Sequence, residues 1–85
     1  MIQDRATQDE ALIEKTRGVA GGSACIVRTR IPVWALENYR RLGWSERQLL
    51  KSFPTLRLHD LHAAWRYANR HKSEIDREIE DNEVA

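Results

Sequence analysis

Hydrophobic and polar residues alternate in the N-terminal third of the chain, and this alternation predicts a β-hairpin. The first strand is expected at 12–16 and the turn at the glycine pair 21–22, because glycine takes the positive φ angles of tight turns without a steric penalty. The second strand, ACIVRTRI, would point Cys25 into the core. Arg28 and Arg30 would lie on its outer face, since successive side chains point to opposite sides of a strand.

From Val33 onward the hydrophobic residues recur every three to four positions, which is the spacing of an amphipathic helix. A first helix is expected from Val33 to Gly43, since glycine commonly follows the last turn of a helix. A second helix is expected to begin at Ser45, where Gln48 completes a Ser-x-x-Gln capping box, and to end before Pro54.

A third helix is expected at 58–71. Its apolar stripe, which we assign to the core, consists of Leu58, Leu61, Ala64, Trp65 and Ala68. The helix at 45–53, the turn and this third helix have helix-turn-helix order. The pattern predicts a mainly α fold with a polar N-terminal tail at 1–10, a hairpin plus helix-turn-helix domain at 11–71 and an acidic helix or tail at 72–85.

The last segment is a weak helix by sequence. It is expected to begin at Ser73 with Asp76 as the capping partner. Its narrow apolar seam consists of Ile75 and Ile79, and carboxylates flank both residues. Such a helix is poorly stable alone, so we expect it to need a docking surface.

The composition is that of a globular protein. Of the 85 residues, 41% are hydrophobic and 32% are charged. No apolar run approaches the roughly 20 residues that a membrane span needs. The single cysteine excludes an internal disulfide and fits a reducing cytoplasm. A domain this small without disulfides often gains buried area by oligomerising, so we expect a cytoplasmic protein that forms a homodimer or has an obligate partner.

Charge is divided unevenly along the chain. Residues 26–71 carry nine Lys or Arg and three Asp or Glu, a net charge of +6, whereas residues 72–85 carry two and six, a net charge of −4. A basic middle suggests a surface for an anionic partner, and the alternative is that these charges only solvate a face of the protein.

The third predicted helix carries a polar strip opposite its apolar stripe, and no acidic residue of the helix interrupts this strip. The strip consists of His59, His62, Arg66, Asn69 and Arg70. On the second helix of a helix-turn-helix it would face the major groove of DNA, where arginine pairs with guanine and asparagine with adenine. We predict that these five residues contact DNA, and the alternative is the ordinary polar side of a surface helix.

Five further residues are candidates for contacts with a protein partner: Arg28, Arg30, Trp44, Ile75 and Ile79. The two arginines could hold phosphates or meet the acidic segment of a neighbouring chain, although Arg30, beside a helix start, could also be structural. Trp44 would belong to a partner surface if it is exposed. Ile75 and Ile79 could lie in a groove of a partner while the carboxylates beside them meet its basic surface.

No combination of residues indicates catalysis, a metal site or a cofactor. His59 and His62 are spaced i, i+3, but the other ligands of a zinc site are missing. Cys25 and His71 could only form a nucleophile–base pair if the thiol were accessible, and a thiol on the inner face of a strand is usually inert. We therefore expect that the protein is not an enzyme.

Three segments, GVAGGSACIVRTRIPVW, GWSERQLLKSFPTL and LHAAWRYANRHKSEID, resemble the small prokaryotic family called domain of unknown function 433. The resemblance covers roughly residues 12–80. It depends most on Thr-Arg-Ile-Pro-Val at 29–33 and on Phe-Pro-x-Leu at 53–56. The family usually has glycine before the Thr-Arg pair, where this chain has Arg28.

This resemblance implies a homeodomain-like helix-turn-helix of three to four helices with a short N-terminal β-hairpin. It also implies an antitoxin of a type II toxin–antitoxin pair, similar in role to VapB antitoxins. Such a protein would neutralise a PIN-like ribonuclease toxin and repress its operon by binding operator DNA. The alternative is a protein-interaction adaptor with no DNA binding.

Overall fold

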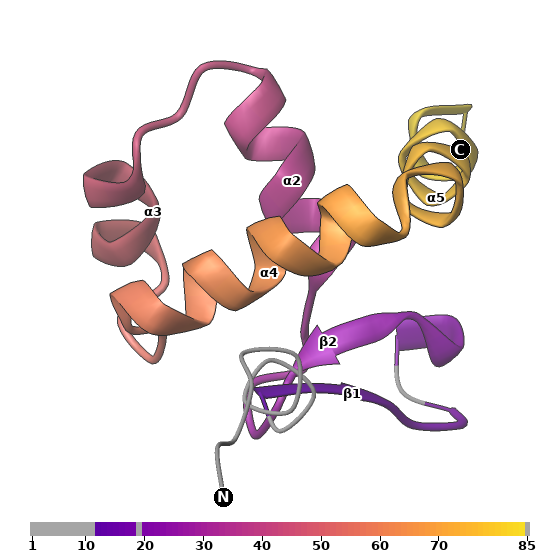
Figure 1. Ribbon diagram of the computed structural model, residues 1–85, viewed down its shortest axis with the longest axis horizontal. Helices are drawn as coiled ribbons and strands as arrows, with labels where there is room; N and C mark the ends of the chain where they lie inside the picture. Colours follow the sequence, from indigo (N-terminus) through magenta and orange to yellow (C-terminus); the bar gives the residue numbers. More distant parts are fainter. Residues whose placement is uncertain (1–11, 19, 85) are drawn as a thin grey trace, which may run out of the picture.

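A three-stranded antiparallel sheet leads into four α-helices in the part of the chain that the structure describes (Figure 1). The computed structural model describes residues 12–18 and 20–84. In chain order the elements are β1 (Ile13–Lys15), the 3-10 helix η1 (Ala20–Gly22), β2 (Ala24–Ile26), β3 (Ile31–Pro32), α2 (Val33–Arg41), α3 (Glu46–Ser52), α4 (Leu58–Arg70) and α5 (Lys72–Val84). The predicted mainly α fold with an N-terminal hairpin is confirmed, whereas the polar tail predicted at 1–10 lies outside the described residues.

The sheet contains the predicted hairpin but not the predicted second strand. β1 and β2 pair antiparallel across the glycine-containing loop, with Ile13 opposite Ile26. β2 ends at Ile26, residues 27–30 form a turn, and β3 pairs back onto β2 with Ile31 opposite Ile26. The continuous strand expected over ACIVRTRI is therefore wrong.

The threonine side chain explains the interruption. The Thr29 hydroxyl donates to the Ile26 carbonyl at 2.8 Å and accepts the Ile31 N–H at 3.1 Å, which closes a local turn in place of a strand. On either side of Thr29, Arg28 has a φ of 66° and Arg30 a φ of 58°, in the left-handed region that favours glycine. Both arginines thus lie on the β2–β3 turn and not on the outer face of a strand.

Replacing Arg28 or Arg30 by glycine is expected to raise the free energy of unfolding by about 0.5–1 kcal/mol. A non-glycine residue in this backbone conformation destabilises the folded state by roughly 1–2 kcal/mol. Glycine removes this strain, but part of the gain is offset because glycine loses more conformational entropy on folding. Urea denaturation of the two variants measures the change. A loss of stability would show instead that the arginine side chains hold the turn together.

The predicted boundaries of the next two helices are confirmed. α2 begins at Val33, and Gly43, just after its end, has a φ of 98°. At the start of α3, the Ser45 N–H donates to Gln48 Oε1 at 2.8 Å and the Gln48 N–H donates to Ser45 Oγ at 3.1 Å. This is the predicted capping box, and it satisfies two backbone donors that would otherwise lack a partner.

The third predicted helix begins where expected, at Leu58, whereas the last helix begins differently from the prediction. At the start of α4, the Arg57 N–H donates to the Asp60 carboxylate at 2.8 Å, so Asp60 supplies the cap for which no hydroxyl residue is present. α5 begins before Ser73, and Asp76 does not cap it. Asp76 pairs instead with Arg41 of α2 at 2.7 Å, which joins the two helices. The capping box expected at Ser73 and Asp76 is therefore wrong.

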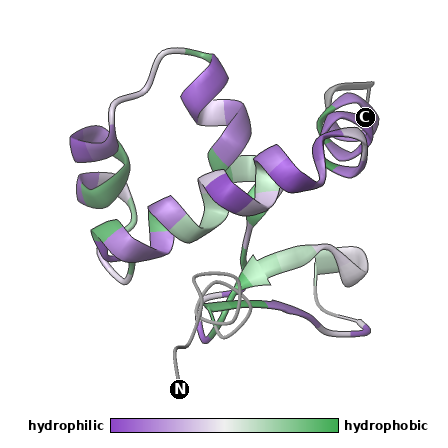
Figure 2. Cartoon of the chain, viewed as in Figure 1, coloured by the Kyte–Doolittle hydropathy of each residue, from purple (hydrophilic) through white to green (hydrophobic). Residues whose placement is uncertain are grey.

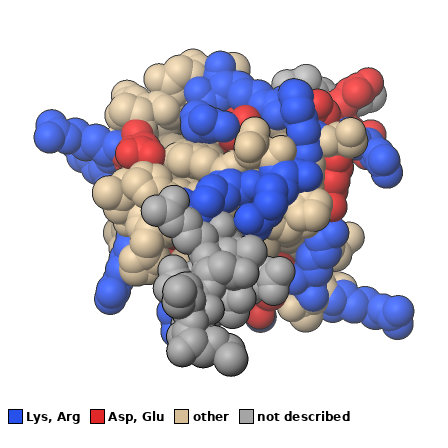
Figure 3. All heavy atoms as spheres, in the orientation of Figure 1, with Lys and Arg blue, Asp and Glu red and all other residues tan. Residues whose placement is uncertain are grey.

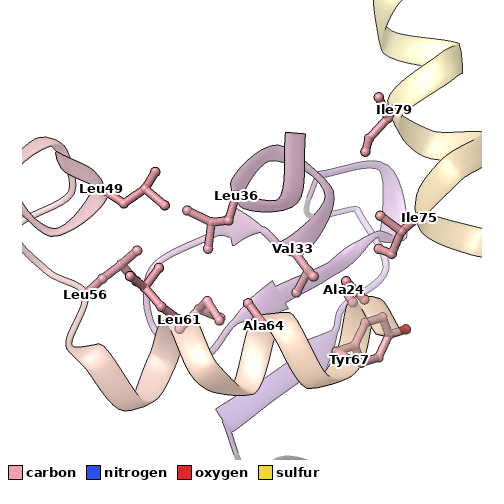
Figure 4. Packing of buried hydrophobic residues seen from close by; sticks show 12 residues of the cluster. Ala24, Val33, Leu36, Leu49, Leu56, Leu61, Ala64, Tyr67, Ile75 and Ile79 are labelled. Carbon is pink, nitrogen blue, oxygen red and sulfur yellow. The ribbon is translucent and has the colours of Figure 1, made fainter. Parts of the chain in front are cut away.

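α2 is central to the packing. It contacts the sheet through β2 and β3, and it contacts both α4 and α5. The buried cluster around it draws on the sheet and on all four helices: Ala24, Ile26, Val33, Leu36, Leu49, Leu56, Leu61, Ala64, Tyr67, Ala68, Ile75 and Ile79 (Figure 4). Figure 2 shows the corresponding pattern, with β2 hydrophobic along its length and the helices hydrophobic on one side only.

α5 belongs to this core. Ile75 is 0% exposed and Ile79 is 6% exposed, and both point from α5 into the cluster (Figure 4). The Ser23 hydroxyl, beside β2, also donates to Glu78 of α5. The docking surface that α5 needs is thus supplied by its own chain. This corrects the expectation that Ile75 and Ile79 are open to a partner.

A polar network holds α5 against β1 and α4. Glu74 accepts hydrogen bonds from Lys15 Nζ at 3.0 Å and from the Tyr67 hydroxyl at 2.7 Å. Burial, and then the hydrogen bond to Glu74, raises the pKa of Tyr67 to about 12, so the hydroxyl stays protonated at neutral pH. Burial alone would raise the pKa of Glu74, but the hydrogen bonds from Tyr67 and Lys15 outweigh it and hold that pKa below its ordinary value of 4.5.

The fold is expected to lose stability as the pH falls below about 4.5, in part because of Glu74. A carboxyl group whose pKa is lower in the folded state stabilises the fold above its unfolded pKa, and that contribution disappears as the pH falls through the folded pKa. Glu74→Gln should therefore flatten the dependence of the melting temperature on pH in this acidic range. Glu80→Gln, an exposed site on the same helix, is the control and should leave the dependence unchanged.

Candidate nucleic-acid interface

α3 and α4 are the two helices of the predicted helix-turn-helix, and residues 53–57 join them. This turn is longer than the usual three or four residues. It is nonetheless packed, because Leu56 is buried in the core and its N–H donates to the Phe53 carbonyl at 2.9 Å. The turn therefore fixes the start of α4 against the rest of the domain.

The outer side of α4 carries most of the predicted DNA strip. His59, Arg66, Asn69 and Arg70 are exposed, while the inner side of the helix is buried against α2. Figure 3 shows Lys and Arg side chains gathered over α2 and α4 on one face of the molecule. The structure thus brings four of the five predicted residues together on an accessible surface.

The side chain of the fifth residue, His62, contacts a carboxylate from α3, a contact that the sequence did not predict. Its Nε2 lies 3.1 Å from Glu46 Oε2, and Trp65 Nε1 donates to the same oxygen at 3.0 Å. The Arg40 guanidinium lies 4.7 Å from the centre of the Trp65 ring, on which it stacks. A carboxylate from the first turn of α3 therefore borders the strip and orients His62 and Trp65.

The predicted partner residues fall into three different places. Arg28 and Arg30 are exposed on the β2–β3 turn. Trp44 is 37% exposed, with its ring centre 4.7 Å from that of Tyr39, and its neighbour Leu42 is 69% exposed. These two residues leave an apolar patch at the α2–α3 connection, whereas the isoleucines of α5 are buried.

The remaining reactive residue, Cys25, lies on the opposite side of β2 from the prediction, because Ala24 and Ile26 are the β2 residues that join the core cluster and successive side chains point to opposite faces of a strand. Its side chain is buried, and this burial raises the pKa of the thiol. Residues 12–18 and 20–84 contain no group of three or more His, Cys, Asp or Glu side chains arranged to hold a metal ion. None of the helices within these ranges has the length and apolar character required to cross a membrane.

Comparison with known proteins bears on this arrangement of a sheet and a helix-turn-helix. The sequence model of a family described as "Protein of unknown function (DUF433)" matches residues 13–68, from β1 to near the end of α4. The chain belongs to the DUF433 family. A DUF433 member protein from Anabaena variabilis ATCC 29413 has a similar crystal structure, with a TM-score of 0.80 and 44% sequence identity. The similarity covers 87% of this chain and 73% of that one. Among curated proteins, no significant match is found.

The DUF433 match includes the β2–β3 turn, α3 and the first eleven residues of α4. Asn69 and Arg70 of the strip, and the whole of α5, lie beyond it. The two core residues Ile75 and Ile79 thus complete the domain from outside the matched segment.

Proposed function

We propose that this DUF433 protein is an antitoxin-type regulator that binds operator DNA through the outer side of α4 and neutralises a PIN-like ribonuclease toxin. The observation that supports the DNA contact most strongly is the shared exposure of His59, Arg66, Asn69 and Arg70. They lie on one side of the second helix of a helix-turn-helix, the helix that enters the major groove in this class of protein.

The chemistry of these side chains fits nucleic acid. Arginine can bind guanine O6 and N7 with two hydrogen bonds, asparagine can bind adenine in the same way, and histidine can donate to a base or a phosphate. A homodimer would present two copies of α4 to the two half-sites of an operator. Each arginine on a phosphate would release condensed counterions, so binding is expected to depend steeply on salt.

The toxin contact is expected on surfaces other than the buried isoleucine seam. Glu80 and Asp81 are exposed on α5. An enzyme that binds RNA carries a basic surface, which these carboxylates complement in charge. Co-purification with the neighbouring toxin should weaken in a Glu80→Lys, Asp81→Lys variant, and an undiminished complex would move the toxin contact elsewhere.

Fluorescence anisotropy with the DNA upstream of the gene tests the DNA contact. The protein is expected to bind this duplex more tightly than a shuffled duplex of equal length, and both affinities should fall as salt rises. Absence of binding to either duplex at low salt would contradict the proposal.

The exposed apolar patch of Leu42 and Trp44 favours a second candidate function, a protein-interaction adaptor that does not bind DNA. In that case no duplex would bind at low salt, and a Trp44→Ala variant would lose its protein partner while keeping its fold.

A further inference from the structure

The β2–β3 turn and the start of α4 enclose a polar hollow of about 330 Å³. Its polar lining comes from the β2–β3 turn, the α3–α4 turn and the first residues of α4, and consists of Arg28, Thr29, Thr55, Arg57, His59 and Asp60. Donor groups dominate this lining, with two guanidinium groups, the Thr55 hydroxyl and an imidazole against one carboxylate, while the Thr29 hydroxyl already donates to the Ile26 carbonyl. That carboxylate, Asp60, already accepts the Arg57 N–H and is almost fully buried. The hollow is therefore suited to an oxyanion.

Several cations of this domain are paired with carboxylates, unlike the two arginines of the hollow. Arg40 and Arg41 both pair with the buried Glu37, and Lys15 pairs with Glu74. Neither Arg28 nor Arg57 forms an ion pair with any residue in the ranges 12–18 and 20–84. Their charge is thus available to an anion from outside the chain.

The backbone at Arg28 indicates that the fold does not require an arginine there. Its φ of 66° is one that glycine takes at lower cost, and Arg28 sits on an exposed turn. The turn therefore carries a charged side chain at a position where the smallest residue would be more stable. Arg30 carries the same cost on the same turn, so what distinguishes Arg28 is its place at the hollow.

We infer that Arg28 and Arg57 hold the sugar–phosphate backbone of the DNA beside the groove that α4 enters; this rests on the proposed function. His59 belongs both to the hollow and to the outer side of α4, so the two surfaces are continuous. A duplex on α4 would carry its phosphates past the start of the helix and over the β2–β3 turn. Contacts to phosphate position the protein on the duplex without reading its sequence, whereas base contacts from α4 specify the site.

Salt-dependent binding of Arg28→Gly and Arg57→Ala tests this division of roles. Each variant is expected to bind operator and shuffled duplexes roughly 3–10-fold more weakly at low salt. Each should also lower the slope of log K against log salt by about 0.9, because one phosphate contact is lost. Arg28→Gly should do so while melting at a higher temperature than the wild type, which separates lost binding from lost folding.

Arg30→Gly is the matched control. Arg30 has the same left-handed backbone on the same turn and loses the same charge, but it does not line this hollow. Its affinity and salt slope should equal those of the wild type. Unchanged slopes in Arg28→Gly and Arg57→Ala, with a wild type that binds DNA, would overturn this inference alone. So would a loss confined to the operator duplex, since it would indicate base reading. A wild type that binds no duplex would overturn the proposed function as well.

Discussion

Replacing Ile75 by alanine is expected to lower the free energy of unfolding by about 2–5 kcal/mol, because the change leaves a cavity in a fully buried site. Small domains are stable by only about 5–15 kcal/mol in total, so this variant should be partly unfolded at moderate temperature. Thermal and urea denaturation measure the loss. The size of the effect follows from the position of Ile75 between α5 and the central helix α2, where no solvent reaches it.

Ile75→Val is the graded control for this prediction. It removes one methylene group and is expected to cost only about 0.5–1.5 kcal/mol. Equal stability of the alanine variant and the wild type would mean that α5 is undocked in solution. The apolar seam of Ile75 and Ile79 would then be free for a partner after all.

The same packing decides how a toxin contact can be tested. Removing the chain after His71 would take Ile75 and Ile79 out of the core and would also break the contacts of Glu74 with Lys15 and Tyr67. Such a truncation is expected to unfold the domain. Loss of a toxin complex on truncation would therefore not identify the binding segment, and substitutions of exposed residues on α5 are needed instead.

Replacing Arg66 and Arg70 together by alanine is expected to weaken operator binding by at least 2 kcal/mol, or about 30-fold. Each bidentate contact of an arginine with guanine contributes about 1–3 kcal/mol of discrimination, and both side chains are exposed on the outer side of α4. The preference for operator over shuffled duplex should shrink as well, because base contacts specify the site. Anisotropy titrations with both duplexes measure the two effects.

Arg77→Ala is the matched control for the double variant, since Arg77 is an exposed arginine on the acidic helix α5. It removes one surface arginine, against two in the double variant, without altering α4, and should leave operator affinity within about threefold of the wild type. Melting temperatures of all variants show whether the fold is retained. Unchanged affinity in a folded Arg66→Ala, Arg70→Ala variant would exclude the outer side of α4 as the DNA contact.

Features that depend on residues close together in the chain could be predicted from the sequence. The capping box of Ser45 and Gln48 and the left-handed Gly43 are local, because the groups that make them lie within four residues. The β2–β3 turn is local too, but the alternation of hydrophobic and polar residues through it predicts a continuous strand instead. Arginine at 28 and 30 gives no sign of a left-handed backbone, and the Thr29 hydroxyl that closes the turn reads equally well as part of a strand.

Features that depend on tertiary contacts could not be predicted in this way. Glu46 lies 16 residues before His62, at the start of another helix, so nothing in the linear pattern places its carboxylate at the DNA strip. The apolar seam of Ile75 and Ile79 predicts that α5 needs a docking surface, but the sequence does not indicate which surface covers this seam. The place of Arg57 beside Arg28 appears only once the β2–β3 turn folds against the start of α4.

The most direct test of the DNA contact is the set of backbone amide NMR shifts of the full chain, recorded while operator duplex is added. The largest changes are predicted in α4 at His59, Arg66, Asn69 and Arg70, with exposed residues of α5 such as Glu80 unchanged. Changes centred on α5 or on the Leu42–Trp44 patch, or the absence of changes at saturating DNA and low salt, would contradict the account.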